Sequence, residues 1–201
     1  MTDKKFLSEV YDLATPDETR ALYDDWSASY DAEITENGYA TPRRIAEALA
    51  QFADASTPVL DFGCGTGLSG LALKSAGFET IDGADLSADM LKGAAEKRAY
   101  RRLWQVEAAD PVPTGYAAIT ATGVIGVGAA PADTFDKLLD ALADGGYFAL
   151  SFNDHALADP QFEGRLTAAT DAGRARLVFK EYGTHLPGID LESNVYVLEK
   201  T

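Results

Sequence analysis

The stretch that decides the fold reads VLDFGCGTG and covers residues 59–67. Its first part is short and mostly apolar, as expected for a buried strand that ends beside Asp61. A glycine-rich turn follows, and the apolar positions after it predict a helix up to about residue 76. Glycines let a backbone approach a ligand closely, and the next helix begins with free N–H groups. This order of strand, turn and helix indicates a ligand site at the end of a parallel sheet.

Segments typical of strands and helices alternate on the carboxyl side of this turn. Strands are expected at residues 80–85, 103–106, 116–122 and 147–152, and two more at 176–180 and 194–198. Helices are expected after Ser87, around the helically spaced Phe135 and Leu139, and around Phe162. The alternation predicts an α/β fold with a largely parallel sheet, to whose edge the last two strands add an antiparallel pair.

The residues before the turn are predicted to be helical. Thr15 and Glu18 have the spacing of a capping box around Pro16, which predicts a helix over about residues 15–28. A second helix is expected to begin at Thr41 and to place Ile45 on its apolar face, together with Leu49 and Phe52.

Composition narrows the classes of partner. The formal net charge of −15 and the pI of about 4.4 make nucleic acid and anionic membranes poor partners. One cysteine and two histidines predict no metal site, and no apolar run approaches the roughly 20 residues that span a bilayer. We therefore expect a cytoplasmic protein, monomer or homodimer, that acts on a small molecule.

Two ligand classes fit the glycine-rich turn. From Gly65 the chain reads G-x-G-x-x-G, with the acid Asp85 about 20 residues further on, which is the dinucleotide pattern. From Asp61 it reads D-x-G-x-G-x-G. The charge of Asp61 would repel a pyrophosphate and attract an amino group, which favours the second interpretation. Tyr196 and Lys200 have the spacing of a dehydrogenase pair, but they fall on an expected strand.

The second pattern resembles motif I of the class I S-adenosylmethionine-dependent methyltransferases. The stretch IDGADLSADML at residues 81–91 resembles the second motif of that family, and Gly145 and Gly146 resemble its glycine pair before strand five. The resemblance implies a Rossmann-like, seven-stranded, mostly parallel sheet with helices on both faces. Its strand order would be 3-2-1-4-5-7-6, with the last strand antiparallel. It also implies S-adenosylmethionine as cofactor and S-adenosylhomocysteine as product.

The same resemblance assigns the cofactor site. Asp85 would bind both ribose hydroxyls, Leu86 and Met90 would flank the adenine, and Glu107, with Asp110 as the alternative, would lie near the adenine amino group. The full set of expected cofactor residues is Tyr30, Asp61, Gly63, Cys64, Gly65, Gly67, Asp85, Leu86, Met90, Glu107 and Gly123.

In more detail, the chain is similar to the small methyltransferases named for the Williams–Beuren syndrome chromosome region. The similarity includes Tyr23, Trp26 and Tyr30, and the segment 123–131, although residues 126–130 contain no histidine where that branch tends to have one. The three aromatic residues either form a helix face of the core or cover the cofactor or substrate. Tyr23 and Trp26 are candidate substrate residues, together with Asn153 and His155, which follow strand five.

The expected function is thus methyl transfer to a small acceptor, without a recognisable catalytic residue. Two alternatives stay open at this point, an NAD(P)-binding oxidoreductase and a non-catalytic module that binds S-adenosylmethionine. We expect one structural domain, in which residues 1–52 pack on or cap the cofactor site and residues 53–201 form the methyltransferase core.

Overall fold

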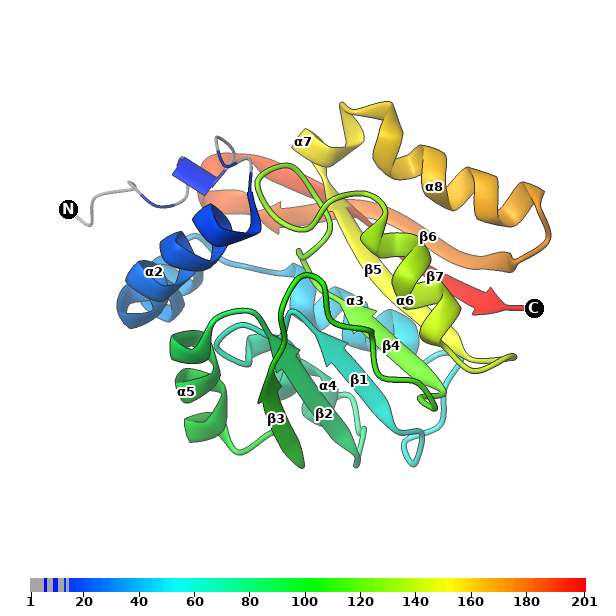
Figure 1. The fold of residues 1–201 in the computed structure, drawn as a ribbon, viewed down its shortest axis with the longest axis horizontal. Helices are drawn as coiled ribbons and strands as arrows, with labels where there is room; N and C mark the ends of the chain where they lie inside the picture. Colours follow the sequence, from blue (N-terminus) through cyan, green and yellow to red (C-terminus); the bar gives the residue numbers. More distant parts are fainter. Residues whose placement is uncertain (1–5, 7–8, 11–12, 14) are drawn as a thin grey trace.

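The computed structural model describes residues 6, 9–10, 13 and 15–201. The described residues form a seven-stranded sheet of order β3-β2-β1-β4-β5-β7-β6 (Figure 1). Its strands are β1 (Val59–Phe62), β2 (Ile81–Asp85), β3 (Arg102–Gln105), β4 (Ala118–Ala121), β5 (Tyr147–Asn153), β6 (Ala175–Leu186) and β7 (Leu191–Lys200). The first five are parallel, and β7 pairs antiparallel with both β5 and β6. The predicted fold class, strand order and antiparallel last strand are confirmed.

Helices cover both faces of this sheet (Figure 1). They are α2 (Pro16–Glu36), α3 (Thr41–Leu49), α4 (Leu68–Ser75), α5 (Ala88–Lys97), α6 (Thr134–Ala141), α7 (Asp154–Leu157) and α8 (Pro160–Asp171). One core cluster joins the sheet to α3 and α4, and a larger one joins it to α6 and α8. In the part of the chain that the structure describes, no helix combines the length and the apolar character that crossing a bilayer requires.

The helix α2 begins as predicted and ends later. The Thr15 hydroxyl accepts from the Glu18 N–H, and the Glu18 carboxylate accepts from the Thr15 N–H, so the capping box is formed. The predicted end near residue 28 was wrong, because the helix continues to Glu36. Its second half packs Ile34 into an aromatic cluster with Trp26, a tertiary contact that the local pattern did not reveal.

The C-terminal hairpin also differs from its prediction. The expected loop between the last two strands shrinks to a short 3-10 turn at Pro187–Ile189, and β6 runs on through Gly183. A glycine suits this strand position because the Arg44 side chain lies against it. A Cβ atom at Gly183 would sit 3.2 Å from Nη2 of Arg44.

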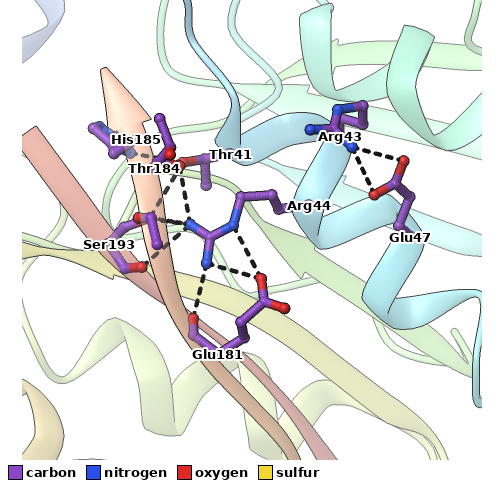
Figure 2. A network of polar contacts seen from close by, with 9 residues as sticks. Thr41, Arg43, Arg44, Glu47, Glu181, Thr184, His185 and Ser193 are labelled. Carbon is purple, nitrogen blue, oxygen red and sulfur yellow. Dashed lines mark hydrogen bonds and ion pairs between the residues drawn. The ribbon is translucent and has the colours of Figure 1, made fainter. Parts of the chain in front are cut away.

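Hydrogen bonds from Arg44 join α3 to this hairpin (Figure 2). Its guanidinium donates to the carbonyl oxygens of Glu181, Gly183, Thr184 and Ser193 at 2.9–3.2 Å, and also to the Ser193 hydroxyl. The side chain is only 9% exposed, whereas the neighbouring Arg43, which pairs with Glu47 on the same helix, is 68% exposed. A single buried cation therefore donates hydrogen bonds to four backbone oxygens of the hairpin.

Replacing Arg44 should therefore destabilise the fold far more than replacing Arg43. We expect Arg44→Met to lower the free energy of unfolding by about 2–4 kcal/mol, because it leaves several carbonyl oxygens without a donor. Arg43→Met, on the same helix, should cost less than about 0.5 kcal/mol. Urea unfolding followed by circular dichroism measures both, and equal losses would contradict the assigned role of Arg44.

Candidate functional site

A cavity of about 320 Å³ opens where the parallel strands end. Its walls come from the segments that follow β1, β2, β3 and β4, and α2 closes it from the other side. This is the edge at which ligands bind in open α/β sheets, and the volume falls in the usual range of small-molecule sites.

The glycine-rich turn between β1 and α4 forms one wall. Gly63 and Gly65 both have positive φ, at 69° and 52°, a conformation that favours glycine. A Cβ atom at Gly63 would lie 2.4 Å from Cγ2 of Val124, so this position has no room for a side chain. Gly65 instead borders open space and lines the cavity. The turn therefore brings bare backbone to the cavity, as the sequence predicted.

Asp85 presents a carboxylate at the end of β2, in the same wall. Its Oδ2 accepts from the Gly65 N–H at 2.7 Å, and its Oδ1 accepts from the Ser87 N–H at 2.9 Å. Burial raises the pKa of Asp85 to about 6, and the charge of Asp61 adds to this effect, while the two N–H groups oppose it. The carboxylate is therefore ionised at neutral pH and titrates just below it.

Asp61 lies outside the cavity wall and stabilises the turn from behind. The side chain is fully buried, and its oxygens accept from the hydroxyls of Ser69 at 2.5 Å, Tyr100 at 2.7 Å and Thr120 at 2.9 Å. Burial raises the pKa of Asp61 against these three hydrogen bonds. The structure thus places Asp61 among the supports of the turn, because its side chain points to the face of the sheet that α4 covers.

The packing of Tyr100 explains why residue 70, the last position of the G-x-G-x-x-G pattern, is a glycine. The Tyr100 hydroxyl accepts from the Gly70 N–H at 2.9 Å, and a Cβ atom at Gly70 would lie 2.3 Å from the Tyr100 ring. Gly70 is therefore required by side-chain packing away from the cavity wall. The third glycine of that pattern gives no support to a pyrophosphate site.

The next wall is apolar, with an ion pair at its rim. Leu86, Met90 and Val106 line the cavity, and they suit a flat ring. Glu107 lines it too, but its carboxylate pairs with Arg20 of α2. Asp110, the alternative to Glu107, also lines the cavity, and its carboxylate accepts from the Glu107 N–H at 2.8 Å. Both acids are thus near the apolar wall, and both have protein partners.

A second cavity of about 70 Å³ adjoins the first. The two share Tyr23, Tyr30, Gly123 and Ala129 as lining residues. Trp26 lines the smaller one, where its ring centroid lies 4.7 Å from that of Tyr30 and its Nε1 donates to Glu33 at 2.8 Å. The aromatic face of α2 therefore serves as core and as cavity wall at the same time.

Most of the predicted residues reach a cavity. Those in the wall of the larger one are Tyr30, Gly63, Gly65, Asp85, Leu86, Met90, Glu107 and Gly123. Of the candidate substrate residues, Tyr23 lines both cavities, and Trp26 and Asn153 line the smaller one.

The structure places the remaining predicted residues elsewhere. Asp61, Cys64 and Gly67 do not line either cavity. Cys64 is buried, which raises the pKa of its thiol, and a Cβ atom at Gly67 would lie 3.0 Å from Cα of Ala94. His155 falls on the exposed side of α7 and lines neither cavity, because the chain turns into a helix directly after β5.

Arg20 and His185 are two of the cavity-lining residues that sequence reasoning missed. Arg20 could have been found, since it lies three residues before Tyr23 on the same helical face. His185 lines the smaller cavity at the end of β6. It was missed because that segment was expected to be a loop.

The Asp61 cluster generates a stability prediction. We expect Tyr100→Phe to lower the free energy of unfolding by about 1–3 kcal/mol, because it removes a donor to a buried carboxylate and the acceptor of the Gly70 N–H. The control is Tyr182→Phe, since Tyr182 is 56% exposed and also bonds an aspartate, Asp154. That variant should lose less than about 0.5 kcal/mol in chemical denaturation. A Tyr100→Phe protein as stable as this control would show that the cluster does not support the turn.

Comparisons with solved structures agree with this fold. The structure of magnesium protoporphyrin IX methyltransferase (ChlM) from Synechocystis PCC 6803 with bound SAM is similar over 100% of this chain and 92% of that one. The TM-score is 0.66 and the sequence identity 14%. The structure of the [4+2]-cyclase SpnF covers 79% of this chain and 80% of that one, with a TM-score of 0.59 and 18% identity. Likeness at these identities concerns the fold alone.

Sequence comparisons identify the family. Human methyltransferase-like protein 27 is 31% identical over 124 residues, which are 58% of this chain and 51% of that protein. The match thus spans about half the length of that relative. The family model described as a methyltransferase domain matches residues 30–193. This range includes the glycine-rich turn, Asp85 and the strand ends that border the two cavities. The chain belongs to this methyltransferase domain family.

Proposed function

We propose that this chain transfers a methyl group from S-adenosylmethionine to a small acceptor. The observation that carries the proposal is Asp85, an ionisable carboxylate that faces the larger cavity and is held by the N–H of Gly65 in the glycine-rich turn. A carboxylate in this position suits a pair of vicinal hydroxyls, such as those of a ribose, because it accepts two hydrogen bonds at once.

The residues present fit an adenosyl ligand. Leu86 and Met90 would hold the adenine, Asp85 the ribose, and the turn at Gly63 and Gly65 the amino acid part. The buried Thr122 hydroxyl, in the same wall, has no hydrogen-bond partner among the described residues, which leaves it available to a ligand. When bound, S-adenosylmethionine supplies a methyl group that its sulfonium charge already activates.

The chain would then contribute mainly position and exclusion of water. Tyr30 lies between the two cavities, and burial holds the pKa of its hydroxyl well above the usual range, so it stays protonated. A protonated phenol is a hydrogen-bond donor and no base. We therefore propose that the smaller cavity takes the acceptor, and that transfer occurs near Tyr30.

We also propose that residues 1–52 cover the donor, as one domain with the core at 53–201. Four contacts of α2 support this idea: Arg20 pairs with Glu107, Asp24 accepts from the Ser87 hydroxyl, and Asp31 accepts from Thr66 and Lys97. Each joins α2 to a segment that borders the proposed donor site. The narrower placement in the Williams–Beuren branch is likewise a proposal, which the aromatic residues Tyr23, Trp26 and Tyr30 of α2 support.

Thermal unfolding with separate ligands tests the donor. S-adenosylmethionine and S-adenosylhomocysteine, each at about 100 times its dissociation constant, should stabilise the protein by roughly 2.7 kcal/mol, a few degrees in Tm. NAD and NADP should have no effect. The shift should be lost in Asp85→Ala and kept in Asp89→Ala, a nearby acid outside the cavity lining. A Tm shift with NAD or NADP alone would favour the alternative of an NAD(P)-binding oxidoreductase. Binding without turnover across an acceptor screen would favour the non-catalytic module.

The pKa of Asp85 gives the proposal a pH dependence. Because burial raises this pKa to about 6, the carboxylate that would accept the ribose hydroxyls is mostly ionised at pH 7.5 and mostly protonated at pH 5. Calorimetric titration should show S-adenosylhomocysteine binding roughly tenfold more weakly at pH 5 than at pH 7.5. Asp85→Asn removes the titrating group, so its affinity should be lower and nearly flat over this range. An equal pH dependence in both proteins would place the ribose elsewhere.

A further inference from the structure

The smaller cavity is compact and has no ionised group in its described lining. Aromatic and aliphatic side chains dominate this lining, including Trp26, Ile34, Tyr39 and Leu186. None of the described lining residues is a Lys, Arg, Asp or Glu. At about 70 Å³ the cavity is smaller than the 150 Å³ engineered cavity known to bind benzene. It therefore suits a compact, uncharged group.

His185 is a buried polar side chain in this wall. It is 6% exposed, and its ring meets that of Tyr39 edge-on, with centroids 5.2 Å apart. Its Nδ1 lies 2.7 Å from the Thr41 hydroxyl, which fixes one side of the ring. The ring makes no other hydrogen bond to the residues that the structure describes, so its second nitrogen, Nε2, has no partner among them.

The hydrogen-bond network behind His185 indicates which ring nitrogen carries the hydrogen of the neutral imidazole (Figure 2). Arg44 can only donate, and it donates to the Ser193 hydroxyl oxygen at 3.1 Å. The Ser193 hydroxyl lies 3.3 Å from that of Thr41, and Thr41 lies next to Nδ1 of His185. Each buried hydroxyl hydrogen finds an acceptor only if Ser193 donates to Thr41 and Thr41 donates to Nδ1. The hydrogen of the imidazole is then on Nε2.

The surroundings also keep the ring uncharged. Burial lowers the pKa of His185 to about 4. The charges of Arg44 on α3 and His155 on α7 lower it further, and Asp154 on α7 opposes them. At neutral pH the side chain is therefore a neutral donor, and it lacks the free lone pair that a general base at Nε2 would need.

We infer that His185 determines acceptor specificity: its Nε2–H binds a carbonyl oxygen of a compact, uncharged methyl acceptor in the smaller cavity. This inference rests on the proposed function. His185 acts here as a positioning residue that selects and orients the acceptor, because a neutral N–H donor offers nothing to a bare alkyl group and takes up no proton. An acceptor with a carboxylate would find no cation in the described lining of the cavity.

The hydrogen assignment can be measured directly. The chain has two histidines, so long-range ¹H–¹⁵N correlation of ¹⁵N-histidine-labelled protein at pH 7 contains two rings, and His155→Asn assigns them. We expect the His185 ring to carry its hydrogen on Nε2 and to have a bare Nδ1. A hydrogen on Nδ1, or a doubly protonated ring, would overturn the inference.

Binding of two matched probes tests the specificity. Acetone and isobutene are both smaller than benzene and have nearly the same shape, but only the ketone accepts a hydrogen bond. Titrations of the parent protein, with and without saturating S-adenosylhomocysteine, should show the ketone shifting the His185 ¹H–¹⁵N signals and binding about three- to tenfold more tightly than the alkene. A parent that does not bind acetone, or that binds both probes equally, would overturn the inference.

Two variants complete the experiment. His185→Asn keeps an acceptor for Thr41, but its shorter amide has no donor at the position of Nε2. Its preference for the ketone, followed by ligand-observed NMR, should therefore disappear. His155→Asn, the exposed counterpart, should keep the preference. Both should bind S-adenosylhomocysteine as the parent does, because neither histidine lines the larger cavity. If the parent does not bind S-adenosylhomocysteine, the proposed function is refuted. The ketone preference and the hydrogen on Nε2 can still be measured without that ligand, so the two failures are distinguishable.

Discussion

The hydrogen bond from the Gly65 N–H to the Asp85 carboxylate joins the two sequence motifs of the site. It joins the glycine-rich turn after β1 to the end of β2. It also uses a backbone donor to stabilise a charge that burial disfavours. The larger cavity, its apolar wall and the cover formed by α2 are all arranged around this fixed carboxylate.

The two aspartates of the motifs have different tasks, which their surroundings determine. Asp61 is buried behind the turn and accepts hydrogen bonds from three hydroxyls. Asp85 lines the cavity and accepts hydrogen bonds from two backbone N–H groups. Sequence reasoning treated both as ligand contacts, because the alternation of a strand indicates on which face a residue lies but not which face the ligand occupies. Tyr100, which distinguishes the two roles, comes from the segment before β3 and has no recognisable motif.

The fold was predictable to a large extent, since strand and helix alternation is a local property. The capping box at Thr15 was predictable for the same reason. The errors arose where distant segments meet. Helix α2 continues past residue 28 because Ile34 joins an aromatic cluster, and β6 continues past residue 180 because Arg44 fills the place that a side chain at Gly183 would take. His185 was missed through the second of these errors.

The proposed donor site and the proposed acceptor cavity share Tyr30 in their lining, and no residue is assigned as a base. In this proposal, Asp85 marks the ribose position. A crystal structure of the protein with S-adenosylhomocysteine tests this most directly. We predict ligand density in the larger cavity, with both ribose hydroxyls on Asp85 and the sulfur toward Tyr30. Density with the ribose away from Asp85, or a ligand outside this cavity, would contradict it.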